Sequence, residues 1–325
     1  MTTLRALCLG EILWDCLADQ PTPVSPLVRS WKRYPGGAPA NVACALAKLG
    51  TPTGFIGGVG TDELGQALVE LLQSLNVNTV GVQHHPASTR QVEVWRLPNG
   101  DCQFVGFRDY PASAFADAQL RADLLPLELF STADFLVLGS LELAYPNSRS
   151  AVQRALELAK QHDLKVLVDI NWRPSFWPEP EQAKPVIQEL MQQVDFLKLT
   201  QEEAEWLLGT ADPVAIAEGA TQLMGVLVTA GAEGCAYWLN QHQGKVPAFG
   251  VEVEDTNGAG DSFVAGFVHQ LCRQGLALME DASTAREAVV YASAVAALTT
   301  TRAGALAAQP SSAEVEAFLY LHRQP

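Results

Sequence analysis

The sequence predicts an α/β fold with a mostly parallel central sheet, and three observations support this prediction. Short apolar runs rich in Val, Leu, Ile and Phe alternate with segments of helical spacing along most of the 325 residues. The runs are apolar on both faces, as is typical of parallel strands covered by helices on both sides. No repeat or low-complexity linker interrupts the sequence. We therefore expect strand–helix–strand alternation around one sheet.

The individual elements follow from the same criteria. Leu4–Leu9 is expected to be a strand, and Ala40–Leu49 a helix that Gly50 ends, because glycine favours the position after a helix end. The further strands are expected at Phe135–Leu138, Lys165–Ile170, Phe196–Leu199 and Val226–Thr229. The further helices are expected at Ser148–His162, Glu181–Gln193 and Pro213–Met224.

Two stretches depart from this alternation and predict a small β lid. Gln91–Leu97 and Cys102–Phe107 flank Pro98-Asn99-Gly100-Asp101, and Asn-Gly is a strong hairpin signal because it accepts positive φ. Trp14–Tyr34, with its prolines, is also expected to be extended. The prediction divides the chain into a large domain (1–13, 38–86 and 112–325) and a lid (14–37 and 87–111). The outer face of the lid would contact either a second copy, giving a homodimer through the lid, or its own domain.

Composition and charge exclude several classes of partner. With 48% hydrophobic and 18% charged residues, the chain is typical of a folded globule. Its net charge of −15 argues against nucleic acid and membrane surfaces, since both are polyanionic. The six cysteines show no CxxC pair, and Glu11 and Asp15 precede any long apolar run. These features predict reduced thiols and a cytoplasmic protein without a signal peptide.

The most informative stretch is Asp255-Thr256-Asn257-Gly258-Ala259-Gly260-Asp261-Ser262-Phe263, which precedes a helical pattern. Gly258 and Gly260 let the backbone approach an anion closely, and amides at a helix N-terminus favour negative charge. The carboxylate of Asp261 would lie beside a transferring phosphoryl group, where it could take a proton from a hydroxyl. A lone Gly-Ala-Gly-Asp is also compatible with a glycine-rich helix cap.

Two motifs together resemble the signatures of a known family. Asp255–Val268 is similar to the C-terminal signature of the PfkB/ribokinase family of carbohydrate kinases, and Gly36-Gly37-Ala38-Pro39-Ala40-Asn41 resembles its N-terminal signature. The similarity extends from Leu7 to Gly304. Within this family the chain resembles the fructokinase branch most. The segments that carry this resemblance are Gly10-Glu11-Ile12-Leu13-Trp14-Asp15, Phe107-Arg108-Asp109 and Asp169-Ile170-Asn171-Trp172-Arg173. The resemblance implies a ribokinase-like three-layer α/β/α sandwich with a β-sheet lid.

The resemblance also implies an ATP-dependent kinase acting on a small sugar, which is fructose if the branch is right, with roles for named residues. Asp261 would be the base, and the amides of Gly258, Ala259 and Gly260 would form the anion hole. The substrate-binding positions implied are Asp15, Gly36, Gly37, Asn41, Arg108, Asn171 and Arg173.

A second group of residues is expected at the nucleotide and its metal. Lys198 lies at the end of an expected parallel strand, where ligands of open α/β sheets bind. The resemblance adds Thr229, Gly231, Gly234 and Asn257 as nucleotide-binding positions, Glu203 as an indirect Mg²⁺ residue, and Asp255 as a residue near a monovalent cation such as K⁺. Thr200 departs from the asparagine of the family motif that ends at Glu203.

Several alternatives stay open at this point. A dehydrogenase is disfavoured, because Gly57-Gly58-Val59-Gly60 lies outside the strand–helix context of a dinucleotide site and no P-loop motif is present. Other small substrates, namely 2-keto-3-deoxygluconate, ribose or a nucleoside, compete with fructose. A non-catalytic relative that keeps the fold as a binding or scaffold protein is the alternative from a different class.

Overall fold

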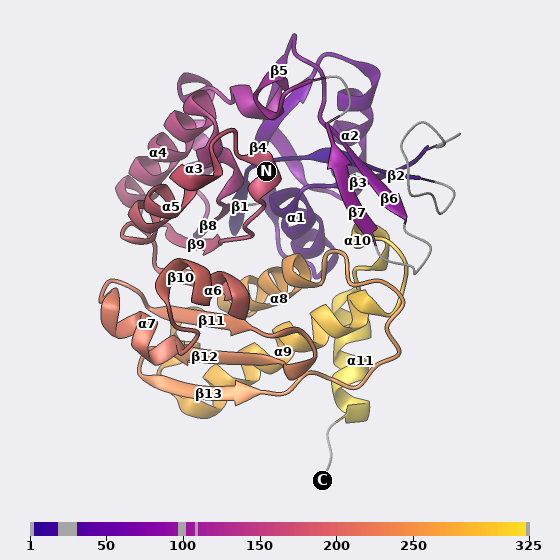
Figure 1. The fold of residues 1–325 in the computed structure, drawn as a ribbon. Coiled ribbons are helices and arrows are strands. Elements are labelled where there is room, and N and C mark those ends of the chain that lie inside the picture. Colours follow the sequence, from indigo (N-terminus) through magenta and orange to yellow (C-terminus); the bar gives the residue numbers. More distant parts are fainter. Residues whose placement is uncertain (1–2, 19–30, 97–101, 108–109, 323–325) are drawn as a thin grey trace.

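The computed structural model describes residues 3–18, 31–96, 102–107 and 110–322, apart from the side chains of residues 96 and 102–105. Within these residues the strands form two sheets. The larger has nine strands in the order β13-β12-β11-β10-β9-β8-β1-β4-β5, and the smaller has four in the order β3-β2-β6-β7. The smaller sheet stands off one corner of the larger (Figure 1).

The large sheet is parallel from β5 to β11 and antiparallel only at the β11-β12-β13 edge. Its strands are β1 (Ala6–Leu9), β4 (Thr53–Gly60), β5 (Asn78–His85), β8 (Phe135–Gly139), β9 (Lys165–Asp169), β10 (Phe196–Thr200), β11 (Gly225–Thr229), β12 (Cys235–Leu239) and β13 (His242–Val246). Because the central strands run in one direction, their carboxyl ends meet at one edge, where ligands of such sheets bind.

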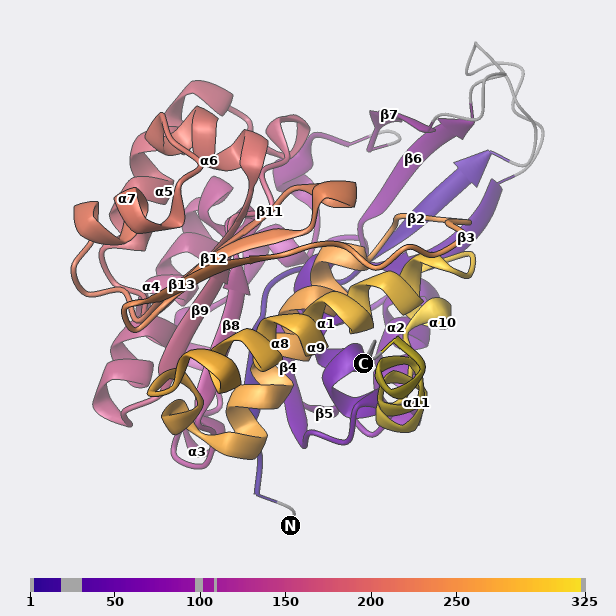
Figure 2. The same cartoon turned by 90° about the horizontal axis from the view of Figure 1, so that it is seen from below.

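Helices cover both faces of the large sheet (Figure 2). One core cluster packs α4–α7 against the sheet, and the other packs α1, α2, α8 and α9. The helices are α1 (Ala38–Lys48), α2 (Glu63–Ser74), α3 (Leu127–Phe130), α4 (Pro146–Gln161), α5 (Ala183–Met191), α6 (Gln201–Leu208), α7 (Pro213–Gly219), α8 (Ala259–Gln274), α9 (Ala282–Thr300), α10 (Ala305–Ala308) and α11 (Ser312–His322). The predicted three-layer sandwich with a β-sheet lid is confirmed.

The small sheet joins two segments that are far apart in the sequence. β2 (Leu13–Ala18) pairs antiparallel with β3 (Trp31–Gly36) and parallel with β6 (Gln91–Arg96), which pairs with β7 (Cys102–Gly106). At its root, the buried Arg90 forms an ion pair with Asp117 and donates Nη2 to the Ala112 carbonyl at 2.9 Å. Arg90 directly precedes β6, so its side chain ties the start of that lid strand to the segment that contains Ala112 and Asp117.

Two expectations about elements need comment. The helix expected over Pro213–Met224 is too long, because α7 ends at Gly219 and Met224 N donates to the Asp195 carbonyl at 2.7 Å as the chain turns into β11. The hairpin strands are found, but the Asn-Gly turn lies outside the described residues. The five cysteines whose side chains are described are buried, and none of them forms a disulfide bond with another.

Candidate active site

The first turn of α8 forms the centre of the candidate site. Gly258 adopts φ +75°, and a Cβ built there would lie 2.7 Å from Cβ of Ala305, so only glycine fits. Ala259 N donates to the Thr256 carbonyl at 3.3 Å, which closes the turn that leads into the helix. The remaining first-turn amides point along the helix axis toward the carboxyl edge of the sheet, where a helix N-terminus attracts anions.

Asp261 follows in the same turn and is held by α1. Its Oδ2 accepts a hydrogen bond of 2.7 Å from Asn41 Nδ2. Burial raises the pKa of Asp261 to about 6, with a further increase from Asp169, although Asn41, Lys198 and Arg173 favour its ionised form. A carboxylate with this pKa is ionised at neutral pH, yet basic enough to accept a proton. The structure thus brings together Asn41 and Asp261, which lie 220 residues apart in the sequence.

The lid contributes a second carboxylate. Asp15 on β2 is half-buried, and a Cβ built at Gly36 would overlap its Oδ2, so the glycine leaves space for this side chain. Burial raises the pKa of Asp15 to about 6, and the charge of Asp261 adds to the increase, whereas Arg173 opposes it. Gly37 has φ +103° and leads directly into α1. Asp15, Gly36, Gly37, Asn41 and Asp261 therefore form one cluster between lid and sheet.

Glu11 belongs to this cluster, although the sequence assigned it no role. It follows β1, is 4% exposed and accepts a 2.9 Å hydrogen bond from Ala38 N at the start of α1. Burial raises its pKa to about 7, and nearby Asp117 and Asp261 contribute. A carboxylate directly after an apolar strand was the available signal, but its partner, a backbone amide of α1, is not visible in a sequence.

Lys198 and Asp169 are neighbours in register on β10 and β9. Lys198 Nζ lies 3.0 Å from each oxygen of Asp169, and both side chains are almost fully buried. Burial lowers the pKa of Lys198, but the carboxylates of Asp169, Glu203 and Asp261 together outweigh this effect and hold the pKa above the ordinary value. A Cβ built at Gly260 would lie 3.2 Å from Lys198 Nζ, so the ammonium group that contacts Asp169 also lies against the first turn of α8.

Glu203 is engaged by the backbone on two sides. Its Oε2 accepts from Thr200 N at 2.8 Å in a capping box at the start of α6, and its Oε1 accepts from Trp172 N at 2.6 Å. Thr200 thus caps α6 where the family motif has asparagine. Because both oxygens of Glu203 already accept backbone hydrogen bonds, its carboxylate fits a contact to the waters of a Mg²⁺ ion better than direct coordination of the ion. Mg²⁺ commonly keeps several waters beside substrate phosphates.

The residues expected at the nucleotide lie along the loops after β11 and before α8. Thr229 ends β11, and Gly231 and Gly234 have φ of +51° and +94° in the turn to β12. Asp255 accepts from Asn257 N and from Gly304 N, both at 2.9 Å, and so ties the turn before α8 to the segment before α10.

The remaining residues that the sequence predicts to bind substrate are Asn171, Arg173 and Arg108. Asn171 follows β9 with φ +41°, and the adjacent Arg173 is exposed, close enough to lower the pKa of Asp15 and Asp261. Arg108 lies outside the described residues. Among the described residues, no group of three or more His, Cys, Asp and Glu side chains could hold a metal ion.

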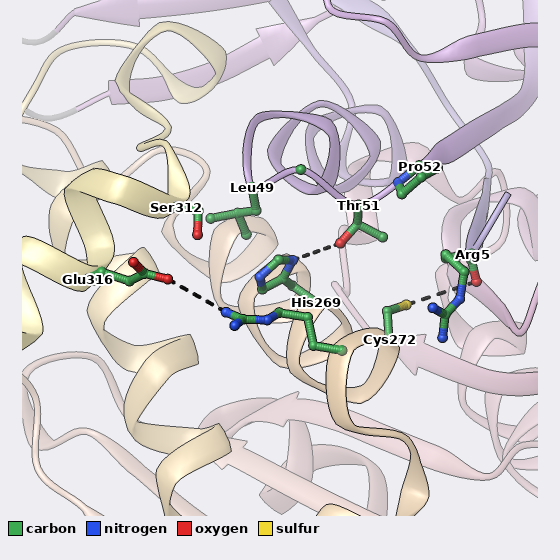
Figure 3. Close-up of a pocket in the computed structure, with 10 residues that line it drawn as sticks. Arg5, Leu49, Thr51, Pro52, His269, Cys272, Ser312 and Glu316 are labelled. Atoms are coloured by element: carbon green, nitrogen blue, oxygen red, sulfur yellow. Dashed lines mark hydrogen bonds and ion pairs between the residues drawn. The ribbon is translucent and has the colours of Figure 1, made fainter. Parts of the chain in front are cut away.

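A hollow of about 430 Å³ lies at the opposite, amino-terminal edge of the sheet (Figure 3). His269 Nδ1 is 2.7 Å from Thr51 Oγ1 there, and burial lowers the pKa of this histidine to about 4. Arg5 pairs with Asp134, and Arg273 Nη1 lies 3.7 Å from Glu316 Oε1. Because each arginine already faces a carboxylate, this hollow has no surplus charge for a ligand.

The fold, with a glycine-rich helix N-terminus beside a carboxylate, is that of the α/β phosphotransferases with an alcohol acceptor. Comparison with known proteins agrees with this class. The pfkB family of carbohydrate kinases matches residues 3–312. The chain is 34% identical to a probable fructokinase-2 of Arabidopsis thaliana, over 95% of this chain and 94% of the relative. The chain belongs to the pfkB family of carbohydrate kinases.

Solved structures agree with this assignment. A fructokinase from Xylella fastidiosa with bound ATP superposes with a TM-score of 0.90 at 30% identity, covering 99% of this chain and 100% of that one. A fructokinase double mutant from Vibrio cholerae O395, with fructose, ADP and potassium ion bound, superposes with a TM-score of 0.83 at 29% identity. The superposition covers 98% of this chain and 98% of that one. Among the described residues, no helix is both long enough and apolar enough to cross a membrane.

Proposed function

We propose that this protein is an ATP-dependent fructokinase that transfers the γ-phosphoryl group of ATP to a hydroxyl of fructose. The observation that carries the proposal is the Asp261 carboxylate, held 2.7 Å from Asn41 in the first turn of α8 and facing the lid residue Asp15. A base, an anion-binding turn and a polar lid are what transfer to a sugar hydroxyl requires. The fructokinase relatives support fructose as the acceptor.

In the proposed mechanism, Asp261 accepts the proton of the attacking hydroxyl as its oxygen bonds to the γ-phosphorus of ATP. The bond between that phosphorus and the β–γ bridging oxygen breaks, and ADP leaves. The amides of Gly258 and Gly260 stabilise the charge on the transferring group, together with the amide of Ala259, which in the ligand-free structure donates to the Thr256 carbonyl at 3.3 Å. Asp15, Gly36, Gly37 and Asn41 hold and orient the sugar, because carboxylate and amide groups match its hydroxyls. The outer contacts proposed to substrate and phosphates are Asn171, Arg173 and Arg108.

The nucleotide is proposed to lie over the loops of Thr229, Gly231, Gly234 and Asn257, with Lys198 beneath its phosphate end. Mg²⁺ bound to ATP would neutralise charge on its β- and γ-phosphates. Glu203 would hold waters of that ion through the outer lone pairs of its carboxylate. Asp255, which orders the turn before α8, is proposed to lie beside a K⁺ ion, as potassium accompanies the Vibrio cholerae relative.

The lid is proposed to consist of residues 14–37 and 87–111, and the large domain of 1–13, 38–86 and 112–325. The outer face of the lid sheet is proposed to join two copies in a homodimer. Light scattering during gel filtration tests this: a mass near 70 kDa, about twice the 34.9 kDa chain, is expected. A mass of one chain at assay concentration would contradict it.

The experiment for the reaction is an ADP-release assay with Mg-ATP and a panel of acceptors: fructose, glucose, ribose, 2-keto-3-deoxygluconate and adenosine. Fructose is expected to give the highest kcat/KM. Preference for another acceptor would retain a kinase and discard fructose. Silence with every acceptor would favour the non-catalytic alternative, a binding or scaffold protein.

A further inference from the structure

The ion pair between Lys198 and Asp169 is buried directly below the anion-binding turn. Lys198 is 4% exposed and Asp169 5% exposed, and Nζ is 3.0 Å from both carboxylate oxygens. Removing two charges from water costs several kcal/mol per ion, and their attraction often fails to offset the cost. Stability alone therefore does not explain this pair, and its position below the turn indicates a functional contribution.

The ammonium group also faces the backbone of α8. A Cβ built at Gly260 would come within 3.2 Å of Lys198 Nζ, so the cation lies against the glycine whose amide belongs to the anion-binding turn. A side chain at position 260 would displace the cation or the helix. The buried positive charge of Lys198 favours an anion at the N-terminus of α8, whereas the Asp169 carboxylate beside it opposes this effect, so the two members of the pair act on the turn with opposite signs.

Asp169 fixes the position of this cation. It ends β9, it is paired in register with Lys198, and Ile170 N donates to the Lys198 carbonyl at 3.0 Å. With two contacts to one carboxylate, Lys198 has little freedom to extend toward a nucleotide. Its effect on the phosphates must therefore be exerted through Gly260 and through space.

We propose that Lys198, held by Asp169, is a positioning residue for phosphoryl transfer, which fixes the first turn of α8 and strengthens its attraction for the transferring group. The inference rests on the proposed function. The charged and polar groups that face Asp261 alongside this pair are Asn41 from α1, Asp15 from the lid, Glu11 after β1 and Arg173 after β9.

The test separates stability from turnover. Lys198→Met leaves Asp169 buried and unpaired, so both thermal stability and kcat are expected to fall. The double variant Lys198→Met/Asp169→Leu removes both charges and is expected to regain most of the stability, as apolar replacements of buried ion pairs do. Its kcat is expected to stay at least about tenfold below wild type, with KM for the sugar within about twofold.

Two further measurements sharpen the test. Lys198 favours ionised Asp261 and Asp169 disfavours it. Lys198→Met should therefore move the acidic limb of the kcat/KM profile to higher pH, and Asp169→Asn should move it to lower pH. Loss of packing alone would not produce shifts of opposite sign. Lys165→Met, at the other end of β9 beside Asp195, is the matched control and should retain wild-type kcat.

The outcomes are distinct from those that test the proposed function. Rates are compared with the acceptor that the wild-type chain phosphorylates fastest, so a change of sugar affects the fructokinase proposal alone. If wild type is active and the double variant regains wild-type kcat together with its stability, the pair is only structural and the inference is wrong. Shifts of the acidic limb in the same direction for both single variants would also overturn it.

Discussion

Asp261 shows how neighbouring groups set the chemistry of one residue. Its carboxylate is buried beside Asp169, yet Asn41, Lys198 and Arg173 limit the resulting rise, and the pKa is about 6. In Asp261→Asn no proton acceptor remains, while the glycine amides stay in place. We expect kcat to fall at least about 10²-fold with little change in ATP affinity. Single-turnover kinetics and ATP titration measure the two quantities, and near-normal turnover would exclude Asp261 as the base.

The same pKa predicts how activity depends on pH. Only the ionised carboxylate can accept the hydroxyl proton, so kcat/KM should be constant near pH 8 and decline about tenfold per unit well below pH 6. The measurement is a pH profile with the coupling enzymes in excess. A profile that stays flat down to pH 5 would mean that no group with this pKa is needed as a base.

At the scale of elements, the capping box joins α6 to the loop after β9. Thr200→Ala removes the hydroxyl that accepts from Glu203 N at 3.2 Å, so stability should fall by about 1 kcal/mol. Thr200→Asn, another good cap, is the matched control and should lose only a few tenths of a kcal/mol. Urea unfolding measures both. Equal losses in the two variants would show that the side chain at position 200 acts otherwise than as a cap.

Elements also show what the sequence could and could not predict. Apolar runs and helical spacing predicted β1, β8–β11, α1, α4, α5 and α7, because each depends on local patterns. The motif from Asp255 to Asp261 was visible because its two glycines and its aspartates lie within seven consecutive residues of the sequence. Glu11 escaped notice, and the pairing of Lys198 with Asp169 was not predicted, because the partners of both side chains come from distant segments. A strand register such as Lys198 opposite Asp169 is fixed only when the sheet forms.

At the scale of the whole molecule, the carboxylates at the carboxyl edge of the sheet oppose folding at neutral pH. Burial raises the pKa of Glu11 to about 7 and those of Asp15 and Asp261 to about 6, above their ordinary values of 4.5 and 3.8. Between those values and the raised ones, the folded state binds more protons than the unfolded state. Its stability therefore rises as pH falls through this window.

The ligand-free protein should accordingly be more stable at pH 6 than at pH 8, by about 1 to 2 kcal/mol from these groups. Urea unfolding at the two pH values measures the difference, and Glu11→Gln, which removes the largest contribution, should reduce it. Catalysis needs Asp261 ionised, so the pH that favours folding should be lower than the pH that favours turnover. Equal or greater stability at pH 8 would show that the ionised forms of these carboxylates do not oppose folding.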